Sequence, residues 1–158
     1  MEDFKPVNPL ILVRHGDYHQ SSGKLSESGK ITISNLLPKL ALFITDPVIF
    51  TSPKLRAWQS AEIFIHTYNP EFRILSLLDY EKFDQEDQGP LFHNIFGLHK
   101  RKKDLILITH LPVVEKILKQ LTGKEVDSNR LETGTAVIID HLTKRAVIVH
   151  GHYELEIE

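Results

Sequence analysis

Two arginines and two histidines stand at or shortly after the ends of three apolar segments, and they are Arg14, His15, Arg56 and His110. An adjacent arginine and histidine at the end of a buried strand cost desolvation free energy unless a partner compensates them. Two guanidinium groups can clamp phosphate oxygens through paired hydrogen bonds. A neutral imidazole, with a reference pKa of about 6.5, can attack phosphorus to form a phosphohistidine that water later cleaves. These residue types therefore favour phosphoryl chemistry.

Each of these residues also has an ordinary structural interpretation. His110 alone could be a hydrogen-bonded structural histidine, Arg56 alone a surface residue, and Gly16 only a turn glycine. Taken together they favour the functional interpretation, because chance seldom gathers four cationic or titratable groups at the ends of three separate strands. A group of arginines would repel Mg²⁺ or Zn²⁺, and the other histidines fit no metal-ligand spacing. We therefore expect neither a metal ion nor a cofactor.

Composition and charge limit the possible classes of protein. A length of 158 residues fits one domain, and we expect residues 1–158 to form it. With 19 basic and 21 acidic residues, the net charge of −2 is too small to recruit nucleic acid or an anionic membrane. The absence of cysteine excludes disulfides, zinc–thiolate sites and a cysteine nucleophile. No apolar run approaches the ~20 residues of a membrane span and no signal peptide is evident, so we expect a cytoplasmic protein.

Short apolar segments alternate with helical patterns along most of the chain. The expected strands are Leu10–Val13, Val48–Thr51, Arg73–Leu77, Leu105–Thr109, Ala136–Asp140 and Ala146–His150. Apolar residues spaced by three and four positions predict helices around 33–40, 57–64 and 114–121, and a further helix is expected over 92–102. Ser52 is a candidate N-cap and Pro53 a candidate first residue of the second helix. Pro38 should kink or split the first helix.

The alternation of strands and helices, with strands that are apolar on both faces, predicts an α/β fold. We expect a three-layer sandwich with a mostly parallel central sheet and an antiparallel edge, the last two strands being joined as a hairpin by residues 141–145. In such sheets ligands bind beyond the carboxyl ends of the strands, where helix N-termini also direct free N–H groups. The two arginines and two histidines stand at this edge, where a phosphoryl group would offset their charge.

Four sequence blocks, in this order, resemble the histidine phosphatase superfamily, which has the phosphoglycerate mutase-like fold. They are LVRHG at 12–16, LSESG at 25–29, SPKLRAWQSA at 52–61 and ITHLP at 108–112, with Ser60 where the family often has threonine. The resemblance implies that His15 is the phosphorylated nucleophile and that Arg14, Arg56 and His110 complete the phosphate pocket. The neighbouring residues Gly16, Asp17, Ser52 and Leu111 are candidates for contacting the substrate.

Within the superfamily, the short SixA-type phosphohistidine phosphatases are the most similar group. RHGD, SPKLRAWQ and THLPVVE resemble their motifs, and these enzymes act on phosphorylated histidine of signalling phosphotransfer domains. Little chain remains between the expected elements for a lid, so we expect a shallow, open pocket. Such a pocket suits a phosphohistidine carried by a protein, whereas a small metabolite profits from an enclosed site.

The general acid is the least defined part of the predicted site. A phosphate ester needs a proton donor for its alkoxide leaving group. Ester-cleaving relatives carry a carboxylic acid for this purpose after the third strand, and here that segment holds Asp79, Glu81, Asp84, Glu86 and Asp87. The sequence places none of them in the pocket, and each could equally belong to a solvated loop. A phosphohistidine leaves as imidazole, which accepts a proton at neutral pH and demands less of an acid.

Three functions remain open at this point. The first is a phosphohistidine phosphatase whose partner is a histidine-phosphorylated protein, and the second is a small-molecule phosphomonoester or pyrophosphate phosphatase of the same fold. The third, from another class, is a non-catalytic module that binds phosphorylated ligands. The presence of both arginines and both histidines counts against the third, because an idle relative would be expected to lose its nucleophile.

Overall fold

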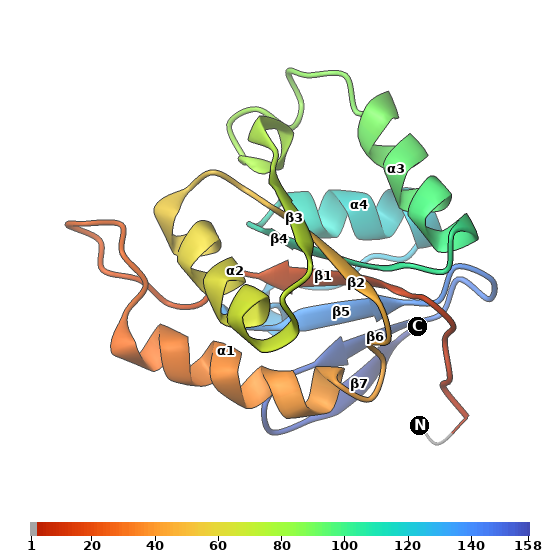
Figure 1. Ribbon diagram of the computed structural model, residues 1–158, viewed down its shortest axis with the longest axis horizontal. Helices are drawn as coiled ribbons and strands as arrows, with labels where there is room; N and C mark the ends of the chain where they lie inside the picture. The colour runs from red at the N-terminus through yellow and green to blue at the C-terminus, as the bar shows by residue number, and fades with distance from the viewer. Residues whose placement is uncertain (1–2) are drawn as a thin grey trace.

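The computed structural model describes residues 3–158 and is built around one seven-stranded sheet (Figure 1). Along the sheet the strand order is β3-β2-β4-β1-β5-β6-β7. The strands are β1 Leu10–Arg14, β2 Pro47–Thr51, β3 Glu71–Ile74, β4 Asp104–Thr109, β5 Ala136–Ile139, β6 Ala146–Val149 and β7 Glu154–Ile157. Strands β3, β2, β4 and β1 are mutually parallel, whereas β5, β6 and β7 are antiparallel to their neighbours. The predicted α/β sandwich with a mostly parallel centre and an antiparallel edge is confirmed.

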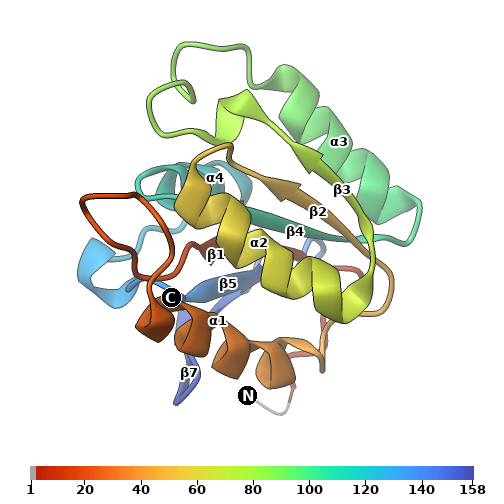
Figure 2. The same cartoon turned by 60° about the vertical axis from the view of Figure 1, so that its left-hand side comes forward.

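Four α-helices cover the two faces of this sheet (Figure 2). They are α1 Glu27–Leu40, α2 Leu55–Tyr68, α3 Gly89–Lys100 and α4 Val113–Thr122. Alternate residues of each central strand point to opposite faces. Leu10 and Leu12 accordingly pack with α3 and α4, while Ile11 and Val13 pack with α1 and α2. In residues 3–158, none of the helices is long and apolar enough to span a bilayer.

The edges of the sheet differ from the sequence-based expectation. The predicted strand Arg73–Leu77 is displaced, because β3 ends at Ile74 and a 3₁₀ turn, η1 Ser76–Leu78, follows it. All four β3 residues are exposed, while Leu77 and Leu78 are buried in the core, so the apolar pattern there marks the turn. Strand β7 was not expected, because its sequence ELEI contains two glutamates and two of its four residues are exposed.

The structure corrects two expectations about the first two helices. Pro38 does not split α1, which runs as one helix through it to Leu40. The proline lacks only its own backbone N–H, and the N–H of Ala41 beyond it still donates to the Leu37 carbonyl at 2.9 Å. Ser52 and Pro53 both precede α2, whose N-cap is Lys54 without a side-chain cap. The Ser52 hydroxyl accepts from the backbone N–H of Lys54 at 3.3 Å and forms a hydrogen bond with His110, as described below.

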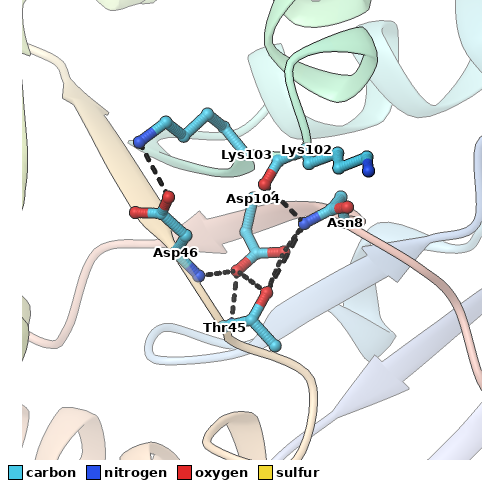
Figure 3. A network of polar contacts seen from close by, with 6 residues as sticks. All are labelled: Asn8, Thr45, Asp46, Lys102, Lys103 and Asp104. Carbon is cyan, nitrogen blue, oxygen red and sulfur yellow. Dashed lines mark hydrogen bonds and ion pairs between the residues drawn. The ribbon is translucent and has the colours of Figure 1, made fainter.

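A polar network fastens the amino ends of the central strands (Figure 3). The fully buried carboxylate of Asp104, at the start of β4, accepts hydrogen bonds from the backbone N–H groups of Thr45 at 2.5 Å and Asp46 at 2.8 Å. Asn8, which precedes β1, donates to the same carboxylate at 3.2 Å. The segments that lead into β1, β2 and β4 are thereby held together at the amino ends of these strands, opposite to their carboxyl ends.

Candidate active site

The register of the sheet brings the two predicted histidines together. Strands β1 and β4 are parallel neighbours in which Arg14 pairs with Thr109, so His15 and His110 leave the two strands at the same level. The backbone N–H of His15 donates to the Thr109 carbonyl at 3.1 Å. As a result, the two imidazole rings lie with their centroids 5.0 Å apart.

All four predicted cationic or titratable groups line one pocket at the carboxyl ends of these strands. The pocket has a volume of about 230 Å³ and is lined by Arg14, His15, Tyr18, Arg56, Tyr80, His110 and Leu111. Arg56 reaches it from the first turn of α2, which begins just beyond β2. The lining contains two guanidinium groups and no carboxylate, a donor set that suits an anion rather than a metal cation.

The hydrogen bonds of His15 determine which ring nitrogen is free to react. Its Nδ1 lies 2.8 Å from the carbonyl oxygen of Gly16. A carbonyl only accepts hydrogen bonds, so Nδ1 carries the proton and Nε2 carries the lone pair. The Nε–H of Arg56 donates to Nε2 at 3.3 Å, which agrees with this assignment. The unprotonated ring nitrogen of His15 therefore faces a guanidinium group inside the pocket.

His110 and Arg14 each keep one buried polar atom without a partner in the part of the chain that the structure describes. Nε2 of His110 lies 2.7 Å from Oγ of Ser52, and the other ring nitrogen, Nδ1, is unpaired. Nη1 of Arg14 donates to the Leu131 carbonyl at 2.7 Å, while its Nε is unpaired. Buried polar atoms are nearly always hydrogen-bonded, so these two unpaired nitrogens of pocket-lining residues are exceptions.

Burial keeps both imidazoles neutral. Desolvation, with a further effect of Arg56 and Arg14, lowers the pKa of His15 to about 4. Desolvation also lowers the pKa of His110 to about 3, and the nearby His15 and Arg56 act in the same direction. Burial lowers the pKa of Arg14 as well, but a guanidinium remains charged in proteins. The pocket therefore combines fixed positive charge with two uncharged imidazole rings at neutral pH.

The residues predicted to contact substrate take different places. Leu111 lines the pocket, whereas Ser52 lies behind it and holds His110. Gly16 is in close packing, because a Cβ there would sit 2.8 Å from the carbonyl oxygen of Gly29. The Asp17 carboxylate is exposed, accepts from Ser28 Oγ at 3.4 Å near the start of α1, and does not line the pocket.

None of the five acidic residues considered as a general acid lines the pocket, namely Asp79, Glu81, Asp84, Glu86 and Asp87. The nearly buried Asp79 accepts from the backbone N–H of Glu81 at 3.1 Å and lies 3.7 Å from Nζ of Lys54. The other four are exposed. Within residues 3–158, no three His, Asp or Glu side chains are grouped as metal ligands.

Sequence reasoning missed two tyrosines of the pocket. Tyr18 lies in the loop between β1 and α1, and Tyr80 lies in the segment between η1 and α3. The guanidinium carbon of Arg56 is 4.3 Å from the centre of the Tyr18 ring and 6.0 Å from that of Tyr80. Tyr18 follows the LVRHG motif by two residues, whereas Tyr80 lies in a polar segment beside no motif, so the sequence offers a signal only for Tyr18.

Comparisons with known proteins agree with this arrangement at the level of the fold. The sequence matches no family model, and a search of curated proteins finds no match. Among solved structures, the protein histidine phosphatase SixA complexed with tungstate has a TM-score of 0.69 and 19% identity, covering 94% of this chain and 96% of that one. The alpha-ribazole phosphatase from Shigella flexneri has a TM-score of 0.62 and 15% identity, covering 90% and 95%.

A mycobacterial glucosyl-3-phosphoglycerate phosphatase is also similar, with a TM-score of 0.61 and 12% identity over 84% of this chain and 92% of that one. The chain thus has the fold of the histidine phosphatases over nearly its whole length. Within that fold, SixA phosphatases are among the similar structures, as the sequence motifs predicted.

Proposed function

We propose that this protein is a metal-independent phosphatase that forms a phosphohistidine intermediate on His15. The observation that carries the proposal is the Nε2 lone pair of His15, which is directed at Arg56 in a pocket shared with Arg14 and His110. A neutral imidazole among fixed cations is suited to attack a phosphoryl group, which is attracted by those cations.

The reaction has two steps. In the first, Nε2 of His15 forms a bond to phosphorus as the bond to the leaving group breaks, and the leaving group takes up a proton from solvent water, which the water that attacks in the second step returns. The hydrogen bond from Nδ1–H to the Gly16 carbonyl steadies the positive charge that the ring then acquires. In the second step, water attacks phosphorus, the Nε2–P bond breaks and phosphate departs. Arg14, Arg56 and His110 would bind the phosphoryl oxygens in both steps.

Three features support a phosphohistidine, carried by a signalling protein, as the substrate. No carboxylate lines the pocket, and imidazole as a leaving group needs the least help from an acid. The volume of about 230 Å³ is below the ~300–1,000 Å³ of typical small-molecule sites, which fits a phosphorylated side chain presented by a partner. One similar structure is a protein histidine phosphatase.

The second candidate function is a small-molecule phosphatase. The alpha-ribazole and glucosyl-3-phosphoglycerate phosphatases among the similar structures favour it. The absence of a carboxylate from the pocket lining weighs against it, because an alkoxide leaving group needs a proton donor. A non-catalytic binding module is disfavoured by the reactive tautomer of His15.

The decisive experiment compares a histidine-phosphorylated phosphotransfer domain with a panel of metabolite phosphates as substrates. We expect turnover of the phosphohistidine, loss of that turnover in His15→Ala, and retention in the exposed control His93→Ala. Rapid quenching should recover phosphate bound to His15. Turnover by His15→Ala would exclude this mechanism, and a strong preference for a metabolite would favour the second candidate.

A further inference from the structure

The side chains available to a leaving group form a small set. Once Arg14, His15, Arg56 and His110 bind the phosphoryl group, the lining that remains consists of Tyr18, Tyr80 and Leu111. These side chains present two aromatic rings and an aliphatic group. A leaving group with several hydroxyls, such as a sugar, would find only the two phenol groups as hydrogen-bond partners in this lining.

The two tyrosines stand in matching positions around the phosphoryl site. The Tyr18 ring meets the His15 ring edge-on, with centroids 5.5 Å apart and an angle of 76° between the planes. The Tyr80 ring meets the His110 ring in the same way, at 5.3 Å and 74°. Arg56 contacts both tyrosine rings. An aromatic wall therefore stands beside each of the two histidines.

Both rings are held by their own segments of the chain. Tyr18 forms an isolated antiparallel bridge with Leu25, which closes the loop that projects beside the start of α1 (Figure 1). Tyr80 follows Asp79, whose carboxylate closes a tight turn by accepting from Glu81, and Nζ of Lys54 lies 5.4 Å from the centre of the Tyr80 ring. Rings that are positioned before binding lose little conformational entropy when a ligand arrives.

We propose that Tyr18 and Tyr80 are specificity-determining residues that pack against a planar, unsaturated leaving group, namely the imidazole of a phosphohistidine. The inference rests on the proposed function and deepens it, because it assigns the leaving-group side of the same pocket. A flat heteroaromatic ring can stack on, or meet edge-on, the tyrosine faces. An aliphatic alcohol gains little from these rings.

The first test measures binding without turnover. Dissociation constants for phenylphosphonate and methylphosphonate, which share the anion and differ in the ring, are measured for the wild type, Tyr18→Leu and Tyr80→Leu. Tyr18→Phe and Tyr80→Phe are the matched controls that keep the ring. We expect the wild type to prefer phenylphosphonate, each leucine variant to lose roughly 3- to 10-fold of that preference, and the phenylalanine variants to retain it.

The second test repeats the comparison during turnover. Phosphoimidazole and phosphoramidate both contain a P–N bond, but only the former has a ring on the leaving group. The ratio of their kcat/KM values should fall in the leucine variants and hold in the phenylalanine variants. Because Tyr80 is 41% exposed and Tyr18 is partly exposed, we expect these variants to fold, which a thermal melt checks.

The outcomes separate this inference from the proposed function. An equal affinity of the wild type for the two phosphonates would overturn the role assigned to Tyr18 and Tyr80. An unchanged preference for phenylphosphonate in both leucine variants would do the same. A loss in the phenylalanine variants as large as in the leucine variants would also overturn it, because the hydroxyl would then be responsible. A ring preference in binding together with no turnover of either P–N compound or of the histidine-phosphorylated domain would overturn the proposed function, while the binding role of Tyr18 and Tyr80 would stand.

Discussion

The proposed function requires His15 to act as a nucleophile while it lies among cations, and its surroundings meet this demand in two ways. The Gly16 carbonyl fixes the proton on Nδ1, so that the lone pair on Nε2 faces the pocket. Burial disfavours the protonated ring, which would be unreactive. Once an anion enters, its negative charge offsets the two guanidinium groups. This lowers the free-energy cost of the positive charge that the ring acquires in the proposed reaction.

The first prediction concerns the titration of the two pocket histidines. NMR of the free protein should show His15 neutral down to a pH of about 4 and His110 neutral down to about 3, because burial lowers both pKa values. An observed pKa near 6.5 for either pocket ring would contradict the buried, neutral site.

The second prediction concerns the guanidinium that faces the nucleophile. Arg56→Ala should lower kcat/KM by about 10²- to 10³-fold, since the variant loses a donor to the developing charge. Arg56→Lys should recover only part of this loss, because an ammonium group cannot make the paired contact. The exposed Arg73 gives the control variant Arg73→Ala, and equal kcat/KM values for the three variants would contradict the assigned role.

At the scale of helices and strands, the sequence predicted buried elements better than exposed ones. Strands β1 and β4 were found because their residues are almost all buried and therefore apolar. The edge strands β3 and β7 carry charged, exposed residues, and their pairing is decided by neighbours rather than by their own pattern. Sequence reasoning missed Tyr18 and Tyr80 for the same reason, because contacts with residues distant in the sequence, rather than a local pattern, place them in the pocket.

The third prediction tests the polar network at the amino ends of the strands. Asp104→Ala should lower the free energy of unfolding by about 2–4 kcal/mol, because several hydrogen bonds to a buried carboxylate are lost. Asp46→Ala removes only the exposed pair with Lys103, at 2.8 Å, and should cost less than about 1 kcal/mol. Urea denaturation measures both, and an Asp104→Ala effect no larger than that of Asp46→Ala would show that the network contributes little.

At the scale of the whole molecule, the stabilising polar network and the pocket lie at opposite ends of the central strands. The Asp104 network lies at the amino ends of the central strands, and the pocket opens at their carboxyl ends. The pocket itself reduces stability in acid, because it buries histidines that would gain a proton if the chain unfolded. His141, near the amino edge, adds to this effect, since burial lowers its pKa to about 4.

The fourth prediction follows from these lowered pKa values. Between about pH 6.5 and pH 4 the unfolded chain binds protons at His15 and His110 that the folded chain refuses, so the folded state loses stability as the pH falls. Above pH 6.5 this loss vanishes, because both states are then neutral at these rings. Between pH 7.5 and pH 5, each of the two rings should cost roughly 2 kcal/mol, measured by urea denaturation. His15→Asn and His110→Asn should each flatten the pH dependence, and a wild-type stability that stays constant or rises toward pH 5 would show that these rings titrate normally in the folded protein.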